Sequence, residues 1–559
     1  VERIDIVGDG NAGQIWFGRD FITLDTLPQY EAQIAQWGQG LTGNREIFLY
    51  ACNLAASQAG IELVNQISEL TNSSVSASRD ITGHSRYGGN WVLEYGNVNT
   101  QPSFDLHKLQ FADVKLAVIT VTSTADNTVV NGQVTLREAI QAADTNLSVD
   151  GSTAGSGLVA DEIKFAPQTN GIPIVLTGQL VITNDPTGLI ITGNGASNTI
   201  IDGGGVDRLF NANVGDMTFE GVTIRNGNSV LGDGGGIRVA NGNVTLINSL
   251  VLNNVAQAAG GGIRGNDVTL INSTVSGNTA SQNGGGGIRA LGNVTLTNST
   301  VSGNTALNPF GSGGGISANG TVSLTNSTVS GNTAQLGGGG IVNGASNVTL
   351  TNSTVSGNQA LNGTGGGIAT SGAVTLTNSI VSGNITSTSG GGIRAVGDVD
   401  LNNSTVSGNT ANASGGGISA NGNVTLNNNS VVQDNQAGQD GGGIYAISKV
   451  TLTNSTVSKN TAGQDGGGIY VGGGGQISNS DITGNEAQTG SGGGIFNGSG
   501  SDLTISASKI TENEASLRGA GIDNEGTLTL KDVTVAGNGQ VFGVNDGGGL
   551  ANGIGATAT

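Results

Sequence analysis

Residues 285–304 read Gly-Gly-Gly-Ile-Arg-Ala-Leu-Gly-Asn-Val-Thr-Leu-Thr-Asn-Ser-Thr-Val-Ser-Gly-Asn. This stretch holds three short segments typical of β-strands, at Gly-Ile, at Val-Thr-Leu-Thr and at Thr-Val-Ser. Each segment is followed by a turn signal, which is a glycine cluster, Asn-Ser or Gly-Asn. The alternation predicts a chain that changes direction after every short strand.

The same phrase recurs along the chain with a nearly fixed period of 25 to 28 residues. A Gly-Gly-Gly-Ile tetrapeptide or a close variant ends at Ile237, Ile263, Ile288, Ile316, Ile341, Ile368, Ile393, Ile418, Ile444, Ile469, Ile495, Ile522 and Leu550. A period of this length built from short strands is typical of a solenoid. Helical repeats contain little glycine, and a leucine-rich repeat needs a leucine-dense consensus. The sequence therefore predicts a parallel β-helix with coils of about 25 residues and three short strands in each coil, which form three sheets.

One coil cannot fold alone. It offers about four inward apolar side chains, for example Ile288, Val294, Leu296 and Val301. Their burial contributes about 8 kcal/mol, at roughly 2 kcal/mol each. Fixing the backbone of a coil costs roughly 1–2 kcal/mol for every residue. The coils must therefore stack and satisfy one another's backbone hydrogen bonds.

Composition excludes several classes of protein. The chain has 559 residues, of which 100 are glycine and 11% are charged, and its net charge is −20. Nucleic-acid binding needs a basic face, so the negative charge argues against it. The glycines follow no Gly-X-Y period, which excludes collagen. A single cysteine, Cys52, excludes a disulfide framework, and no apolar run reaches the length of a membrane span.

Aromatic residues divide the chain. Of the 20 Phe, Trp and Tyr, 12 lie in residues 1–112. Strand-like runs at 4–7, 46–52 and 74–78 alternate there with two helical patterns, which predicts a small α/β domain. We expect residues 113–230 to form a cap and the irregular first coils, and residues 231–559 to form the regular β-helix.

Asparagine occupies one phase of the repeat in almost every coil. Asparagine tolerates a left-handed backbone and bonds neighbouring main chain, and stacked copies can form an amide ladder. We expect such a structural ladder from Asn254, Asn278, Asn304, Asn332, Asn358, Asn384, Asn409, Asn435, Asn460, Asn485, Asn513 and Asn538. A second column, which includes Asn272, Asn298, Asn326, Asn352 and Asn378, lies in Asn-Ser-Thr or Asn-Ser-Ile.

Carboxylates are the only candidate metal ligands. Asp233, Asp440, Asp465 and Asp546 precede glycine clusters and are weak candidates for Ca²⁺ on the surface. We expect no other cofactor. Residues 245–435 contain only seven charged side chains and no long insert, so the carboxylate-lined groove of a glycan-cleaving enzyme is not expected.

Residues 1–112 resemble the DUF4347 domain found near the start of large bacterial surface proteins, many of them cyanobacterial. The resemblance rests on residues 6–13 (Ile-Val-Gly-Asp-Gly-Asn-Ala-Gly), on 49–56 (Leu-Tyr-Ala-Cys-Asn-Leu-Ala-Ala), and on Ile-Thr-Gly and Gly-Gly-Asn-Trp within 81–91. It implies a caspase-like fold, in which a His–Cys dyad would fall at Asp9 and Cys52. The family usually has Ser-His-Gly where residues 8–10 read Gly-Asp-Gly. Because Asp9 cannot act as an imidazole base, we expect this cysteine-peptidase-like head to be inactive.

The rest of the chain also resembles known proteins. Residues 134–140, Val-Thr-Leu-Arg-Glu-Ala-Ile, resemble the first segment of bacterial β-helix surface proteins, often Ser-Leu-Arg-Glu-Ala-Ile, where a short helix covers the first coil. The coils resemble the pectin-lyase-like superfamily and the repeats of polymorphic outer-membrane proteins. These resemblances imply a right-handed parallel β-helix in a secreted or cell-surface protein. The DUF4347 family usually has further residues before this point, so we expect some before Val1.

The resulting hypothesis is a non-enzymatic structural or adhesion protein. Only nine residues follow Leu550, and an uncapped last coil would favour head-to-tail self-association into filaments or matrix. Extracellular polysaccharides and other surface proteins are the further partners expected, with no nucleic acid and no membrane span. A polysaccharide-binding or polysaccharide-cleaving β-helix is the alternative.

Overall fold

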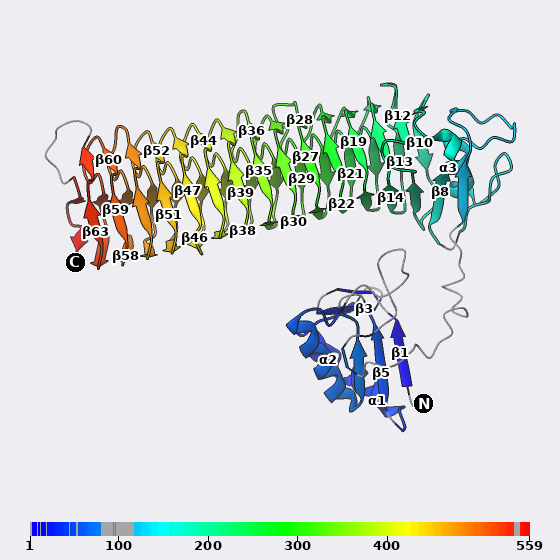
Figure 1. Cartoon of the computed structure of the whole chain (residues 1–559), viewed down its shortest axis with the longest axis horizontal. Coiled ribbons are helices and arrows are strands. Elements are labelled where there is room, and N and C mark those ends of the chain that lie inside the picture. The colour runs from blue at the N-terminus through cyan, green and yellow to red at the C-terminus, as the bar shows by residue number, and fades with distance from the viewer. Residues whose placement is uncertain are drawn as a thin grey trace. The chain divides into compact units, whose positions relative to one another are not determined.

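The computed structural model describes residues 3–7, 9–11, 13–17, 20–43, 45–51, 54–79, 93, 95–96, 117–157, 159–540 and 548–559 (Figure 1). The chain forms two compact units, Val1–Lys115 and Leu116–Thr559. Each unit has its own core and is described by itself.

The first unit is an α/β domain. In chain order its elements are β1 (Arg3–Val7), β2 (Asp9–Asn11), β3 (Gln14–Phe17), β4 (Asp20–Ile22), α1 (Glu31–Gln39), β5 (Glu46–Tyr50), α2 (Gln58–Thr71) and β6 (Ser74–Ala77). Strands β1, β5 and β6 form a parallel sheet in that order, as the alternating pattern predicts. The antiparallel sheet β2–β3–β4 was not expected. Helices α1 and α2 pack against each other, and the core includes Ile47, Leu49, Leu63 and Ile67.

The second unit is a parallel β-helix. A representative coil contains β25 (Ile288–Ala290), β26 (Val294–Thr297), β27 (Thr300–Ser302) and β28 (Thr305–Ala306). The first three are the strands expected from the sequence. The fourth is a two-residue strand, and its presence gives the β-helix one more ladder than the three sheets predicted.

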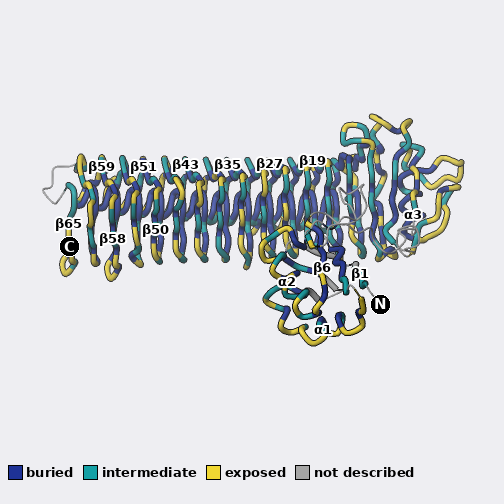
Figure 2. The backbone as a smooth tube through the Cα atoms, turned by 60° about the horizontal axis from the view of Figure 1, so that its bottom comes forward, coloured by how far each residue is buried: buried dark blue, intermediate teal, exposed yellow. Residues whose placement is uncertain are grey.

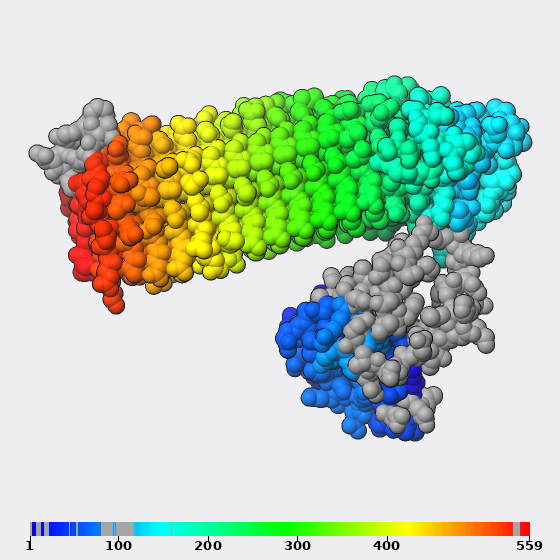
Figure 3. Space-filling model, in the orientation of Figure 1, coloured from blue at the N-terminus to red at the C-terminus, as the bar shows by residue number. Residues whose placement is uncertain are grey.

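Strands of each kind stack into one sheet, and we name the sheets after the residues of this coil. Among the described residues, the Val-Leu sheet has 17 strands from β7 (Val118–Val121) to β66 (Thr557–Ala558), and the Gly-Ile sheet has 15 from β10 (Leu180–Ile182) to β65 (Leu550–Asn552). In the same part of the chain the Thr-Val sheet has 15 strands from β9 (Ile174–Val175) to β63 (Thr534–Ala536), and the Thr-Ala ladder has 13 from β16 (Asn228–Ser229) to β64 (Gly539–Gln540). In the space-filling view successive coils form even bands (Figure 3).

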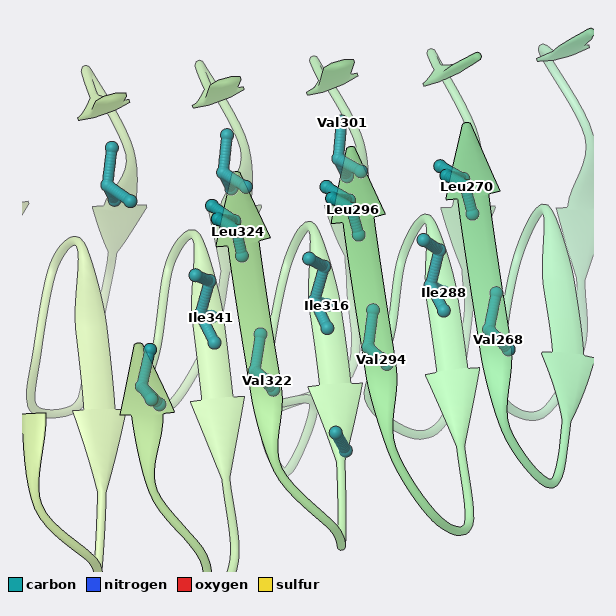
Figure 4. Packing of buried hydrophobic residues seen from close by; sticks show 14 of the residues in the cluster. Val268, Leu270, Ile288, Val294, Leu296, Val301, Ile316, Val322, Leu324 and Ile341 are labelled. Atoms are coloured by element: carbon teal, nitrogen blue, oxygen red, sulfur yellow. The ribbon is translucent and has the colours of Figure 1, made fainter. Parts of the chain in front are cut away.

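The pairing register between neighbouring coils places residues of the same type next to one another. Ile288 pairs with Ile263 on one side and with Ile316 on the other. Val294 and Leu296 pair in the same way with Val268 and Leu270. Rows of identical side chains therefore run along the axis, and Figure 4 shows them pointing into the interior. In Figure 2 buried positions recur from coil to coil along the β-helix. This row packing lets one short phrase build a continuous core.

Helix α3 (Leu136–Thr145) packs against the first strands of the β-helix, β7, β8 (Asp161–Phe165) and β10. It begins with a capping box, in which Thr135 Oγ1 accepts from the Glu138 N–H and Glu138 Oε2 accepts from the Thr135 N–H at 2.9 Å. Its Leu136 and Ile140 join the core of the coils. Within the described part of the chain, no helix combines the length and the apolar character needed to cross a membrane.

Candidate functional site

The asparagine column lies inside the corner between the Thr-Val sheet and the Thr-Ala ladder. Asn304 Nδ2 donates to Asn332 Oδ1 at 2.9 Å and to the Val275 carbonyl at 3.0 Å. Asn332 Oδ1 also accepts from the backbone N–H of Asn304 at 3.0 Å. The same pattern links all the ladder residues from Asn254 to Asn538. Each inner amide is buried with its hydrogen-bonding capacity filled, which makes the ladder structural.

The left-handed backbone belongs to the other asparagine column. Asn298 and Asn326 have φ of 50° and 49°, and Asn272, Asn352 and Asn378 are alike. In the ladder column the residue before each asparagine takes this conformation instead, as Gly303 does with φ of 62°. The sequence assigned left-handed tolerance and amide stacking to the same residues. In the structure the buried continuous ladder lies at the corner after the Thr-Val strand, and the left-handed asparagines lie at the corner before it. Some amides of this second column also bond one another, as Asn326 Nδ2 does to Asn298 Oδ1 at 3.2 Å.

The glycine clusters serve the ladder as well as the turn. Gly285 has φ of 76°, so it makes the turn. A Cβ on Gly287 would lie 2.9 Å from Asn304 Cγ and 2.8 Å from the Gly315 carbonyl oxygen. The last glycine of the cluster therefore leaves room for the ladder amide, and no larger residue fits without a shift.

The described aspartates that were candidates for calcium binding instead accept hydrogen bonds from the next coil. Asp233 Oδ1 accepts from the Ala259 N–H at 2.9 Å, and Asp440 Oδ1 accepts from the Asp465 N–H at 3.1 Å. Asp465 Oδ1 accepts from the Ser491 N–H at 2.8 Å. Asp546 lies outside the described residues. Within those residues, no group of three or more His, Cys, Asp or Glu side chains is placed to hold a metal ion.

The positions of the peptidase-like dyad are only partly described. Asp9 begins β2, and Cys52 lies outside the described residues, as do residues 81–91. The caspase-like arrangement and its inactivity stay predictions.

Arginines form a column on the outer face of the Gly-Ile sheet. Arg238, Arg264 and Arg289 are in register on β17 (Ile237–Val239), β21 (Ile263–Gly265) and β25. Their Nη1 atoms donate to Asn211 Oδ1 at 2.8 Å, to the Val239 carbonyl at 2.7 Å and to Ser317 Oγ at 2.8 Å. Burial lowers the pKa of Arg264 and of Arg289 from the ordinary value, the Asp233 carboxylate opposes this effect, and the neighbouring arginine lowers the pKa further. A guanidinium stays protonated at neutral pH, so the column is positive.

A groove opens beside two of these arginines. It has a volume of about 410 Å³ and is lined in part by Asp233, Arg264, Asn283, Arg289, Phe310 and Ser317, which we call the arginine groove. Phe310 is 79% exposed. Sequence reasoning missed this site, although two signals were present. Arginine follows the repeat isoleucine in these coils, and the interval from Ile288 to Ile316 is among the longest.

Three aromatic rings continue the same outer column in later coils. Tyr445 and Tyr470 stack with ring centroids 4.9 Å apart, and Tyr470 and Phe496 stack at 5.1 Å. Because the ring faces cover one another, they stabilise neighbouring strands and present their edges outward.

Among the described carboxyl groups, the largest upward pKa shift lies within residues 113–230, which we call the capping region. Burial raises the pKa of Asp161 to about 6, and the nearby Asp185 carboxyl raises it further. Burial also raises the pKa of Asp185. The Oδ2 atom of each residue is buried without a hydrogen-bond partner. Perturbed carboxyls often mark catalytic sites, but these two are 0% and 2% exposed and belong to the interior of the unit.

Comparison with known proteins identifies both parts. Residues 1–114 match the family described as domain of unknown function DUF4347, and residues 205–381 match the family described as right handed beta helix region. No curated protein and no solved structure gives a significant match to the chain. The chain thus joins a DUF4347 domain to a right-handed β-helix.

Proposed function

We propose that the protein is a non-enzymatic structural or adhesion protein of the bacterial cell surface, whose β-helix acts as a spacer or matrix rod. The observation that carries this proposal is the uniformity of the coils. Hydrophobic rows, an amide ladder and four strand ladders repeat in register over the regular region. Such repetition extends a rigid rod, and coil intervals of 25 to 28 residues leave little room for the varied loops that usually build active sites.

An extracellular location follows from the family resemblance. The resemblance of residues 1–112 and of the coils is to surface and secreted proteins, and we extend that location to this chain. Protease treatment of intact producing cells tests it, with a cytoplasmic protein as control. Loss of the full-length band while the control survives supports the proposal. Full protection until the cells are lysed contradicts it.

Self-association is the second part of the proposal. Adjacent coils are nearly interchangeable, since Ile288, Val294 and Val301 occupy positions filled by Ile, Val and Val in the next coil. A coil of another copy would offer the same hydrogen-bonding register, and a non-closing contact of this kind produces filaments. Sedimentation velocity and negative-stain microscopy of the 559-residue chain over a range of concentrations test it. Monomers alone at high concentration contradict head-to-tail assembly.

A polysaccharide-binding rod is the second candidate function, and the arginine groove favours it. The enzymatic alternatives have direct tests. Incubation with uronic-acid polymers would reveal cleavage, and labelling of Cys52 by a thiol-reactive probe at neutral pH would reveal an activated thiolate. We expect neither.

A further inference from the structure

The outer face of the Gly-Ile sheet carries three arginines that the fold does not require. Arg238, Arg264 and Arg289 follow one another in register, and we call them the arginine column. Later strands place small neutral residues at the same outward position, as Ser317 and Ala369 show. Like charges directly opposite on neighbouring strands are destabilising. Three successive cations at a position that accepts serine and alanine therefore indicate a use beyond stability.

The arginine column keeps a positive charge although a carboxylate lies beside it. Asp233 Oδ2 is 3.9 Å from Arg264 Nε, and the Asp233 carboxylate also opposes the effect of burial on the pKa of Arg289. Arg208 and Asp207 interact next to the column and balance each other. The three guanidinium groups of the column and the one carboxylate of Asp233 leave a net charge of +2. The column can therefore pair with two further carboxylates.

An aromatic column occupies the same outward position further along the sheet. It consists of Tyr445 on β49 (Ile444–Ala446), Tyr470 on β53 (Ile469–Val471) and Phe496 on β57 (Ile495–Asn497), which pair in register. The three rings stack on one another, and all three residues are half-buried. Their exposed edges form an apolar strip that spans three strands, as the arginine column does.

Two carboxylates lie beside the aromatic column. Burial raises the pKa of the Tyr470 hydroxyl, and Tyr445, Asp440 and Asp465 raise it further, so both carboxylates are close to this ring. The Oδ1 atom of each aspartate accepts one backbone N–H from the next coil. Among the ion pairs of the described residues, none involves either aspartate. The aromatic column therefore carries two carboxylates that can pair with external cations.

The two columns lie at equal distances from Ala369. Three pairing steps lead from Arg289 to Ala369, and three more lead from Ala369 to Tyr445. Two copies that meet face to face and antiparallel, with a twofold axis at Ala369, therefore bring the arginine column of each copy onto the aromatic column of the other. The opposed residues are Arg289 and Tyr445, Arg264 and Tyr470, and Arg238 and Phe496. The opposite charges of the two columns match in this arrangement.

Apolar side chains at the ends of two strands match as well. Leu291 directly follows β25 and is 41% exposed, and Ile447 directly follows β49 and is 53% exposed. At this position most other regular coils have a polar residue or glycine, such as Asn319 and Gly344. The twofold axis runs along the strands, so β25 of one copy faces β49 of the other with both strands running in the same direction. Leu291 therefore lies opposite Ile447.

We propose that two copies of this chain pair side by side and antiparallel through the outer faces of their Gly-Ile sheets. The guanidinium groups of the arginine column bind Asp440 and Asp465 of the other copy, and Leu291 packs against Ile447. Every contact occurs twice, because a twofold interface is self-complementary. The pairing uses the side of the β-helix, so it goes beyond the end-to-end contact proposed above and joins separate rods laterally.

Cross-linking tests the geometry of the pair. In a Cys52→Ser background, which has no other cysteine, 559-residue chains carrying Leu291→Cys and Ile447→Cys are mixed and treated with a short bis-maleimide. We expect a cross-linked dimer in the mixture. We expect none in either variant alone, because six strands, about 29 Å, separate the two copies of one position.

Sedimentation velocity tests the charges. We expect the 559-residue chain to be a dimer at low salt and to dissociate as the salt concentration rises. Arg289→Glu places a carboxylate opposite Asp440, and we expect the dissociation constant of the dimer to rise about tenfold or more. Adding Asp440→Arg to this variant exchanges the two charges and should restore the dimer. Lys509→Glu is the matched control, because it reverses an exposed charge on β59 (Lys509–Thr511) of the Thr-Val sheet and should leave the dimer unchanged.

Thermal unfolding of each variant checks that the β-helix is intact. Monomers alone at low salt, no cross-link in the mixture, a cross-link in either variant alone, failure of the charge-exchanged variant to dimerise, or equal effects of Arg289→Glu and Lys509→Glu would overturn the inference. End-to-end filaments do not bring residues 291 and 447 together. Filaments without a cross-link would therefore contradict the lateral pair and leave the head-to-tail proposal standing, so the two failures are distinguishable.

Discussion

The regular coils and the capping region bury different polar groups. In the regular coils the polar groups that recur in the interior are neutral, and each inner ladder residue such as Asn358 fills its donors and acceptors with neighbouring coils. The buried carboxyl of Asp523 is an exception near the far end. In the capping region the buried groups include several carboxyls, and Asp161 and Asp185 each keep one oxygen without a hydrogen bond. Repetition explains the difference. A repeating coil always has an equivalent partner on either side, whereas residues near the first coil need individual partners.

We expect the largest effect on stability when one amide is removed from the middle of the ladder. In Asn358→Ala the Asn332 N–H and side-chain amide lose their acceptor, and the Val329 carbonyl loses a donor. Several buried groups are left unpaired, so we expect the free energy of unfolding to fall by about 3–5 kcal/mol. Guanidinium chloride denaturation gives the global effect, and hydrogen exchange of the Asn332 amide gives the local one.

Asn538→Ala is the control at the far end of the described ladder. Asn538 also accepts from Asn513, but this bond is only partly buried. We expect a clearly smaller loss of stability. Equal losses for the two variants would mean that burial of the ladder does not set its contribution.

A methyl group added to the glycine cluster would press on a ladder amide from the neighbouring turn. A Cβ on Gly340 would lie 2.9 Å from Asn358 Cγ and 2.8 Å from the Gly367 carbonyl oxygen. We expect Gly340→Ala to lower the free energy of unfolding by about 2–3 kcal/mol, because the packed corner has to shift. Gly344→Ala is the matched control, since its Cβ would meet nothing within 4 Å. Its denaturation midpoint should be unchanged or slightly higher.

The regular coils were predictable because each residue type has one structural role, in the turn, in the strand or in the ladder. The glycine cluster, the Val-Thr-Leu-Thr phrase and the ladder asparagines repeat in one phase, so phase alone locates the strands and the core. The two-residue strand at Thr305–Ala306 was missed because Thr-Ala is too short to show a β pattern. The arginine groove was missed because it depends on the neighbours in three dimensions: Arg264 and Arg289 are 25 residues apart in sequence but paired in register.

Neutralising Asp161 should stabilise the capping region at neutral pH. The folded-state pKa of about 6 lies above the ordinary 3.8, so the folded protein holds this proton more tightly than the unfolded chain. The resulting penalty is fully present above pH 6 and disappears as pH falls towards 3.8. We expect Asp161→Asn to raise the free energy of unfolding by about 1–2 kcal/mol at pH 7.5 and to lose this advantage near pH 4. Denaturation at both pH values measures it.

Asp150 provides a control of opposite sign. Its carboxylate accepts hydrogen bonds from the backbone N–H groups of Gly132, Asn131 and Gln133, which lower its pKa. Ionised Asp150 therefore stabilises the fold above its unfolded pKa, and this contribution is lost in acid. Asp150→Asn should be slightly destabilising at neutral pH. A destabilising Asp161→Asn at pH 7.5 would show that the buried carboxylate is compensated in the fold.

The smallest expected effect concerns a coil that departs from the repeat. The residue before each ladder asparagine adopts positive φ, and in most regular coils it is glycine, as at Gly303 and Gly408. In one later coil it is the exposed Lys459, with φ of 55°. A left-handed conformation costs a residue with a Cβ roughly 1 kcal/mol, whereas glycine adopts it readily. Lys459→Gly should therefore raise the free energy of unfolding by about 0.5–1 kcal/mol, despite the greater freedom of glycine in the unfolded chain.

Lys459→Ala is the control, because it removes the charge but keeps the left-handed backbone strain. If it stabilises the protein as much as Lys459→Gly in guanidinium chloride denaturation, then charge and not backbone conformation distinguishes this coil from the regular ones.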